Sequence, residues 1–287
     1  MLSDAVAGGE APRGAQQDPF SQEVANRTMR FETLAAASEK FARLADSNLD
    51  LDVKACPGWS VADLVGHLGG VYSWVVMVMA ADGERPTGQR QSAPSDPDLI
   101  LEWFAERRSS LLASLSSRPY DAPAWTFSTR TSATTAWWLR RQAAETAIHL
   151  HDMEEAVSGG ALGGSAAGSA AAGSAPAGSA AAVSPLAAAD GVDEVLTDMA
   201  PSYLDRNQTD LRGSLHVHAT DTPGEWTVDF DVRPVDVRRE HAKGSAAVRG
   251  PARDLFLWLW NRRSLDEAPM EVFGDLDVAR SWEQIRI

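Results

Sequence analysis

The sequence predicts an α plus α+β protein, with an N-terminal four-helix bundle and a smaller C-terminal α+β domain. In the N-terminal half, apolar residues recur in four segments with the 3.6-residue period of a helix. These segments are residues 22–46, 60–81, 98–117 and 134–157. A tract of Gly, Ala and Ser follows, and beyond it apolar and polar residues alternate with the two-residue period of strands.

Composition divides the chain into four regions. Residues 1–21 are rich in Gly, Ala, Gln, Asp and Pro and are expected to form a disordered leader. Residues 22–157 form the predicted bundle. Residues 158–189 are almost entirely Gly, Ala and Ser, and we expect a flexible linker there because they cannot bury a core. Residues 190–287 form the predicted α+β domain.

Charge and cysteine content limit the possible partners. The formal net charge of −14 argues against a nucleic acid or an anionic membrane surface, since both attract basic proteins. The single cysteine, Cys56, allows no intrachain disulfide, which suits a reducing compartment. The leader lacks a signal-peptide pattern, and no apolar run approaches the roughly 20 residues that span a bilayer. We therefore expect a cytoplasmic protein.

The second predicted helix begins at a clear N-cap. Ser60 and Asp63 have the spacing of a capping box, directly after the Pro57-Gly58 turn. The apolar stripe that follows predicts the core face of this helix. It contains Val61, Leu64, Leu68, Val71, Val75 and Val78. His67 and Trp74 lie together at one edge of that stripe.

The fourth predicted helix carries Glu145 and His149, which are four residues apart and so share one face. Such a pair is most often a solvated ion pair, and a lone His67 is most often a core residue. Together the three residues offer an alternative, a His-Glu-His metal site that leaves a coordination position open, as catalytic zinc sites do.

This metal hypothesis makes a demand on topology. His67 lies early in its helix, whereas Glu145 and His149 lie late in theirs, so the two helices must run antiparallel. A simple up-down-up-down bundle would make them parallel. The Pro- and Gly-rich stretch at 82–97 is long enough for a crossover. The hypothesis therefore predicts an up-down-down-up bundle.

Other candidates are weaker. Asp152 is a possible outer-shell partner for a ligand imidazole, whereas we expect His151 on the helix surface. His216 and His218 share a strand face. We expect both side chains to be exposed there, in preference to the alternative that the two imidazoles weakly chelate a metal. For Cys56 we expect a packing role, because no base is evident for it.

Beyond the linker, the pattern predicts a helix at 190–205 and strands at 215–219, 225–232, 235–240, 245–249 and 270–273. A further helix is expected from Pro251.

Three motifs in this sequence resemble one known family. They are Pro57-Gly58-Trp59-Ser60-Val61 with Leu64-Val65-Gly66-His67-Leu68, then Glu145-Thr146-Ala147-Ile148-His149-Leu150-His151-Asp152, then residues 249–262 with the closing Gly274-Asp275. Together they are similar to the mycothiol-dependent maleylpyruvate isomerase family of the DinB-like metalloenzyme superfamily. The chain's preference for Arg over Lys suggests a GC-rich genome, which agrees with the actinobacteria in which mycothiol occurs.

The resemblance implies a DinB-like bundle and a sterol-carrier-like α+β domain that covers the metal site. It implies that His67, Glu145 and His149 bind a divalent metal, usually Zn²⁺, with mycothiol as the thiol cosubstrate. The zinc-bound thiolate would attack a small electrophile, in an isomerase or a thiol S-transferase reaction. Arg262, by its place in the third motif, would hold a substrate carboxylate, although a role as a helix-end charge is equally open. The alternative function is a non-catalytic small-ligand binding protein, or a metal or thiol sensor, on the same scaffold.

Overall fold

The computed structural model describes residues 19–163, 182–207 and 209–285 of the 287-residue chain. Most of the predicted leader and linker therefore lies outside the described residues. Helices reach into the edges of both regions, since α1 begins at Pro19, α4 ends at Gly163 and α5 begins at Pro185.

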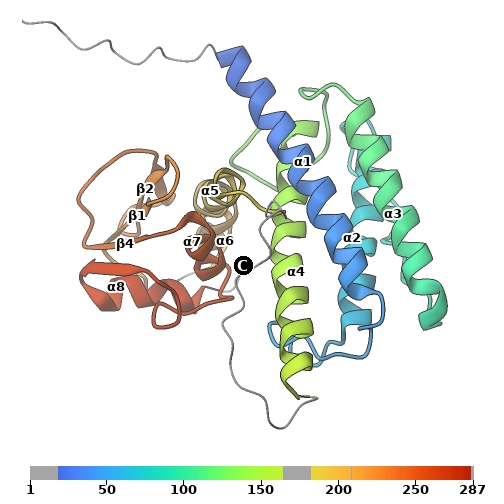
Figure 1. The fold of residues 1–287 in the computed structure, drawn as a ribbon. Coiled ribbons are helices and arrows are strands. Elements are labelled where there is room, and N and C mark those ends of the chain that lie inside the picture. Colours follow the sequence, from blue (N-terminus) through green and yellow to red (C-terminus); the bar gives the residue numbers. More distant parts are fainter. Residues whose placement is uncertain (1–18, 164–181, 208, 286–287) are drawn as a thin grey trace, which may run out of the picture.

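The N-terminal part is the predicted four-helix bundle (Figure 1). Its helices are α1 (Pro19–Ala45), α2 (Val61–Ala80), α3 (Pro97–Ser117) and α4 (Thr135–Gly163). The predicted capping box is present, because the Asp63 amide donates to the Ser60 side chain and the Ser60 amide donates to the Asp63 carboxylate. All six predicted core residues of α2 are buried. At the start of α3, Leu99 is 50% exposed, whereas the neighbouring Ile100 is buried.

Contacts between α2 and α4 show that these helices are antiparallel. The hydroxyl oxygens of Tyr72 and Thr146 are 2.7 Å apart. Met79, near the end of α2, contacts Thr135 at the start of α4. Helices α2 and α3 run in the same direction, joined by the long crossover after α2, as Figure 1 shows. The bundle therefore has the predicted up-down-down-up order.

Helix α2 corrects the prediction that no apolar run approaches the length that spans a bilayer. Among the described residues it alone is long and apolar enough, by length and composition, to cross a membrane. Its apolar side chains, however, are mostly buried against the other helices, so they serve as the core of the bundle.

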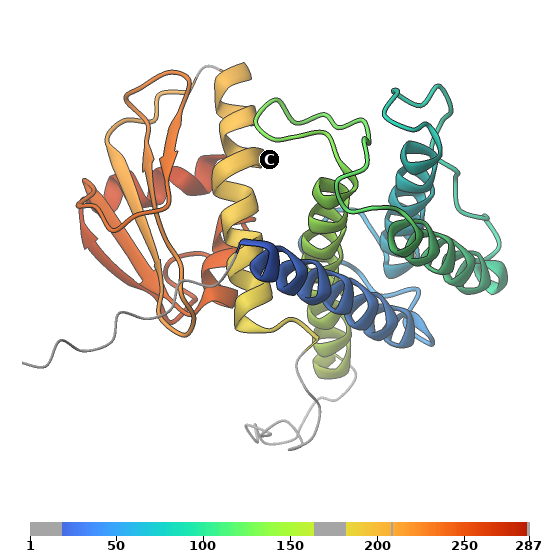
Figure 2. The same ribbon diagram turned by 90° about the horizontal axis from the view of Figure 1, so that it is seen from above.

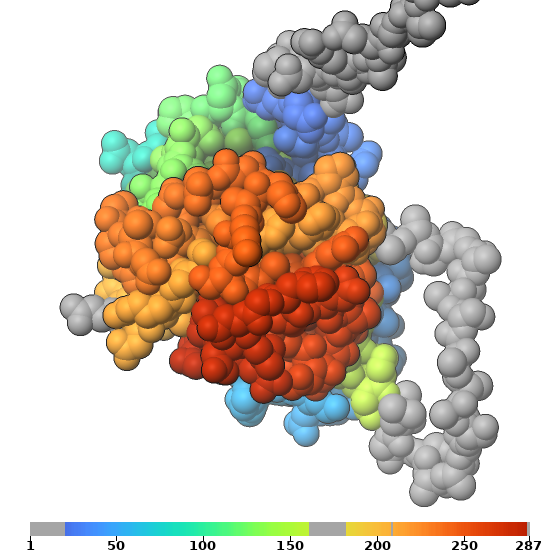
Figure 3. All heavy atoms as spheres, turned by 90° about the vertical axis from the view of Figure 1, so that its left-hand side faces the viewer, coloured from blue at the N-terminus to red at the C-terminus, as the bar shows by residue number. Residues whose placement is uncertain are grey.

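The C-terminal part is a small α+β domain with a mixed five-stranded sheet in the order β3-β2-β1-β4-β5. The strands are β1 (Ser214–Ala219), β2 (Glu225–Asp229), β3 (Asp236–Arg238), β4 (Ala246–Gly250) and β5 (Glu271–Gly274). Strands β1 and β4 are parallel and the other neighbours are antiparallel. Helices α5, α6 and α7 lie between the sheet and the bundle (Figure 2). Seen from the left-hand side of Figure 1, the domain lies in front of the bundle (Figure 3).

The helix predicted at 190–205 is longer and interrupted. It consists of α5 (Pro185–Glu194), a π-helical turn (Val195–Met199) and α6 (Ala200–Arg206). The Ala200 amide donates to the Val195 carbonyl, and Pro201, which has no amide hydrogen, follows at once. Helix α7 (Ala252–Leu259) was predicted, whereas α8 (Leu276–Ser281) and the 3-10 turn Trp282–Gln284 are too short to give a periodic signal.

Helix α4 joins the two parts because it contributes to both hydrophobic cores. Leu139, Leu150 and Met153 pack in the bundle, while Ala144 and Ile148 pack against the C-terminal domain. The middle of the helix is consequently buried on nearly all sides, and several of its charged and polar side chains are buried with it. This placement puts the face of α4 that carries Glu145 and His149 at the boundary between the domains.

A close helix contact in the bundle gives a stability prediction. A Cβ added at Gly69 would lie 2.3 Å from the Trp103 ring, so Gly69→Ala should lower the free energy of unfolding by about 1–3 kcal/mol. The matched change Gly159→Ala meets no atom closer than 3.9 Å and should leave stability unchanged or raise it by up to about 1 kcal/mol. Urea denaturation of both variants checks the prediction, which equal effects would contradict.

Candidate metal centre

The structure brings together His67 from α2 and Glu145 and His149 from α4. One potential ligand atom from each side chain lies within 4.8 Å of the other two. Glu145 Oε1 is 3.4 Å from His67 Nε2 and 3.4 Å from His149 Nε2. A tetrahedral zinc ion with bonds of about 2.0–2.1 Å holds its ligand atoms about 3.3 Å apart, so the two observed distances match ligand spacing.

The second nitrogen of His149 is held by a chain of polar contacts. His149 Nδ1 lies 2.9 Å from Asp152 Oδ2, and Arg262 donates to both oxygens of Asp152 at 3.0 Å. The Asp152 side chain is fully buried. Burial raises the pKa of Asp152, but His149 and Arg262 outweigh this effect and keep the pKa below its usual value. An ionised Asp152 therefore orients the ring so that Nε2 faces Glu145.

Glu145 is held ionised by a second buried group. Arg141 donates to Glu145 Oε2, and its other arm donates to Glu194 on α5 at 2.6 Å. Burial raises the pKa of Glu145, yet Arg141 and the two histidines hold it well below its ordinary value. The oxygen opposite the Arg141 contact, Oε1, faces the two imidazoles, as a metal ligand would.

A pocket of about 650 Å³ opens onto this cluster between the two domains. Its walls are largely aromatic, and the C-terminal domain closes one side with Met199, Trp260 and Arg262. Gln142 also lines the pocket, and its buried Oε1 accepts no hydrogen bond from the described part of the chain. The pocket has the size and mixed lining of a small-molecule site, with an unused acceptor inside it.

The other sequence candidates are placed as follows. Arg262 lines the pocket, but its guanidinium is already paired with Asp152 and also donates to the Trp260 carbonyl. The expectation of a surface position for His151 is wrong, since it is buried where α4 meets the C-terminal domain. Cys56 is partly buried, and burial raises the pKa of its thiol.

Sequence reasoning missed the residues that hold Glu145 in place, one on α4 itself and two in the C-terminal domain. Arg141 is four residues before Glu145, a spacing that indicates an ion pair on a helix. This pair could therefore have been predicted from the sequence. Glu194 and Trp260, whose ring lies 5.1 Å from the Arg141 guanidinium, become neighbours only through the packing of the two domains.

The protonation of His149 gives a pH prediction for the metal-free protein. Burial lowers its pKa, but hydrogen bonds with Asp152 and Glu145 outweigh burial and raise the pKa to about 9, from an ordinary 6.5. Since the folded-state pKa is the higher one, this stabilisation is full below about pH 6.5 and is lost as the pH rises through 9. The loss should amount to about 3 kcal/mol.

Urea denaturation of the metal-free protein at about pH 6 and about pH 10 measures this loss, with His149→Gln as the matched control. The control should lack most of the pH dependence. An identical pH dependence in both proteins would contradict the assignment to His149.

The fold and the cluster define a class of protein in which a helical bundle and an α+β domain enclose a His-Glu-His set. The sequence-family model for the mycothiol maleylpyruvate isomerase N-terminal domain matches residues 30–154. The family model for the MDMPI C-terminal domain matches residues 187–281. The chain belongs to the mycothiol-dependent maleylpyruvate isomerase family.

Solved structures agree with this assignment at the level of the fold. The mycothiol-dependent maleylpyruvate isomerase is 10% identical with a TM-score of 0.53, over 89% of this chain and 96% of that one. A histidine-to-alanine mutant of that enzyme is 10% identical with a TM-score of 0.52, over 85% and 92% of the two chains. No curated protein sequence matches this chain.

Proposed function

We propose that this protein is a metal-dependent, mycothiol-using enzyme, a maleylpyruvate isomerase-like isomerase or a thiol S-transferase. The observation that carries the proposal is the convergence of His67, Glu145 and His149 on the interdomain pocket in a chain of this family. We assign these three residues as the ligands of a divalent ion, with zinc as the best fit to two imidazoles and one carboxylate.

The donor set supports a catalytic site more than a structural one. Three protein ligands leave a position open toward the pocket, whereas structural zinc sites are closed by four protein ligands. When bound, such an ion would lower the pKa of a thiol at the open position, so that the nucleophilic thiolate exists at neutral pH.

The chain's own residues then have distinct tasks. Asp152 fixes the His149 ring, and Arg141 fixes the Glu145 carboxylate. The aromatic walls exclude water from the thiol and the electrophile. We propose that Arg262 presents to a substrate carboxylate the N–H groups that Asp152 and Trp260 do not use.

Two reaction outcomes fit this arrangement. In an isomerisation, the thiolate sulfur forms a bond to one carbon of an activated double bond, and the electron pair moves to the conjugated carbonyl. Rotation about the resulting single bond follows, after which the pair returns and the carbon–sulfur bond breaks. In an S-transfer, the sulfur stays bound and a leaving group departs with the electron pair.

The proposed partners are a low-molecular-weight thiol and a small electrophile. The net charge of −14 disfavours nucleic acid as a partner. We propose a cytoplasmic location, where a thiol cosubstrate stays reduced.

A direct test is to incubate the zinc-loaded protein with mycothiol and a panel of small electrophiles that includes activated cis-alkenes with a carboxylate. We expect catalysed isomerisation without net thiol loss, or thiol loss matched by a thioether product. Absence of turnover, together with tight binding of a small ligand, would instead support the alternative of a non-catalytic binding or sensing protein.

A further inference from the structure

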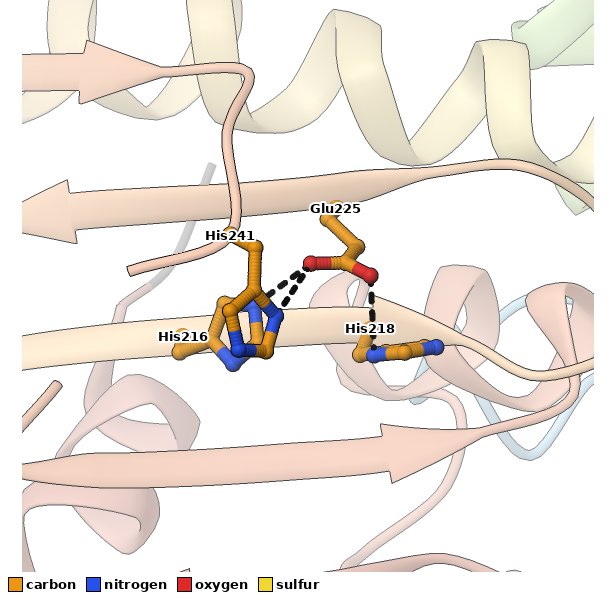
Figure 4. Close-up of side chains that lie close together, drawn as sticks. All are labelled: His216, His218, Glu225 and His241. Atoms are coloured by element: carbon orange, nitrogen blue, oxygen red, sulfur yellow. Dashed lines mark hydrogen bonds and ion pairs between the residues drawn. The ribbon is translucent and has the colours of Figure 1, made fainter. Parts of the chain in front are cut away.

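A second cluster of metal-ligating side chains lies on the sheet of the C-terminal domain, on the face opposite to its buried core. His216 and His218 are on β1, Glu225 is on β2, and His241 is on the segment between β3 and β4. One ligand atom from each of the four residues lies within 4.8 Å of the others. Figure 4 shows the three imidazole rings gathered around the Glu225 carboxylate.

The register of the strands explains this convergence. His216 and His218 are two residues apart, so both side chains point to one face of β1. Glu225 is the antiparallel partner of His218, which places its carboxylate beside both rings. His241 then comes over the same face, with its ring centre 5.1 Å from that of His216.

Ion pairing alone accounts poorly for the arrangement. Glu225 Oε2 lies 3.5 Å from His216 Nε2 and 2.6 Å from His241 Nδ1, and Glu225 Oε1 lies 3.3 Å from His218 Nδ1. One carboxylate balances only one imidazolium. His216 is 6% exposed, and its Nε2 has no hydrogen-bond partner within the described residues, although it points at the carboxylate.

We propose that His216, His218, Glu225 and His241 form a second metal site, a closed site of three nitrogens and one oxygen for a divalent transition ion such as Zn²⁺. One atom from each residue lies within 4.8 Å of the others, and the His216 and His218 nitrogens lie 3.5 and 3.3 Å from the two different oxygens of Glu225. Ligand atoms around tetrahedral zinc are roughly 3.3 Å apart, so a small adjustment of the carboxylate would bring one oxygen to ligand spacing. The contact to His241 is shorter, but that side chain is 77% exposed and is free to move to ligand spacing.

Four protein ligands make this site structural rather than catalytic. The ion would join three parts of the domain: the central strand β1, its neighbour β2, and the segment at 239–245 that connects β3 to β4. The site thus fastens this connection onto the sheet and works independently of the interdomain pocket.

Zinc titration of the 287-residue chain separates the two proposed metal sites. The natural sequence should bind two equivalents, and a variant with His67→Ala and His149→Ala should keep one. In that variant, His241→Ala or Glu225→Gln should weaken zinc binding by at least about tenfold. Loss of a residue that only orients a metal ligand already costs roughly that much, and these two residues are proposed as ligands themselves. Lys243→Ala, an exposed control in the same segment, should bind as before.

Unchanged affinity in the His241→Ala and Glu225→Gln variants would overturn the four-ligand site, since binding would then rest on the His216-His218 pair alone. Hydrogen exchange of the unsubstituted protein provides a second measurement that needs no variant. Zinc should slow amide exchange at 239–245, and unchanged exchange there would also refute the site. If the variant with His67→Ala and His149→Ala bound as much zinc as the natural sequence, and only His241→Ala or Glu225→Gln weakened binding, this inference would stand while the proposed function failed.

Discussion

Replacing His67 by Ala should abolish the proposed metal binding in the interdomain pocket and lower the proposed thiol-dependent turnover by about a thousandfold. The reason is that two remaining ligands, Glu145 and His149, cannot hold a divalent ion in a fixed geometry. The several kcal/mol that such an ion contributes to a reaction correspond to about three powers of ten in rate. Metal content per chain and the initial rate with mycothiol and the best electrophile of the panel check this expectation.

The substitution tests function rather than folding. The His67 side chain is 28% exposed, so its removal leaves no sealed cavity. The free energy of unfolding of the metal-free variant should therefore lie within about 1 kcal/mol of that of the metal-free parent. A variant that retains stoichiometric zinc in this pocket and full activity would refute His67 as a ligand.

The substitution Asp152→Asn should reduce both metal affinity and stability. The two Asp152 oxygens accept from Arg262 and His149, so either orientation of an Asn amide turns its NH₂ group toward a donor. Because His149 loses its orienting acceptor, zinc affinity should fall about 10- to 100-fold. Because Arg262 loses its buried counter-charge, the free energy of unfolding should fall by about 3 kcal/mol.

Glu154→Gln is the matched control for this substitution. It makes the same chemical change on the same helix, at a residue whose partly exposed carboxylate pairs with Lys40 and Arg253. Its effect on stability should stay within about 1 kcal/mol, and zinc affinity should not change. Equal effects of the two substitutions would show that Asp152 does not act through His149.

The sequence predicted the elements of the bundle and their order well, because the signals were local. The Ser60-Asp63 capping box, the apolar stripe of α2 and the crossover after Ala80 each act within a few residues. A His-Glu-His cluster also requires α2 and α4 to be antiparallel, and the contact of Tyr72 with Thr146 shows that they are.

What the sequence did not reveal depends on contacts between distant segments. The pairing of Arg262 with Asp152 was not predicted, because Asp152 lies 110 positions earlier in the chain. His151 was expected on a surface, but the C-terminal domain covers it. The convergence of His241 with His216 and His218 depends on how the segment after β3 folds back over the sheet, which no periodicity encodes.

Anomalous X-ray diffraction at the zinc edge, on crystals of the zinc-loaded protein, tests the central claim most directly. We expect an anomalous peak in the interdomain pocket, about 2.0–2.1 Å from His67 Nε2, His149 Nε2 and a Glu145 oxygen. A pocket without a peak in zinc-saturated crystals, with Glu145 still bound to both imidazoles, would contradict it.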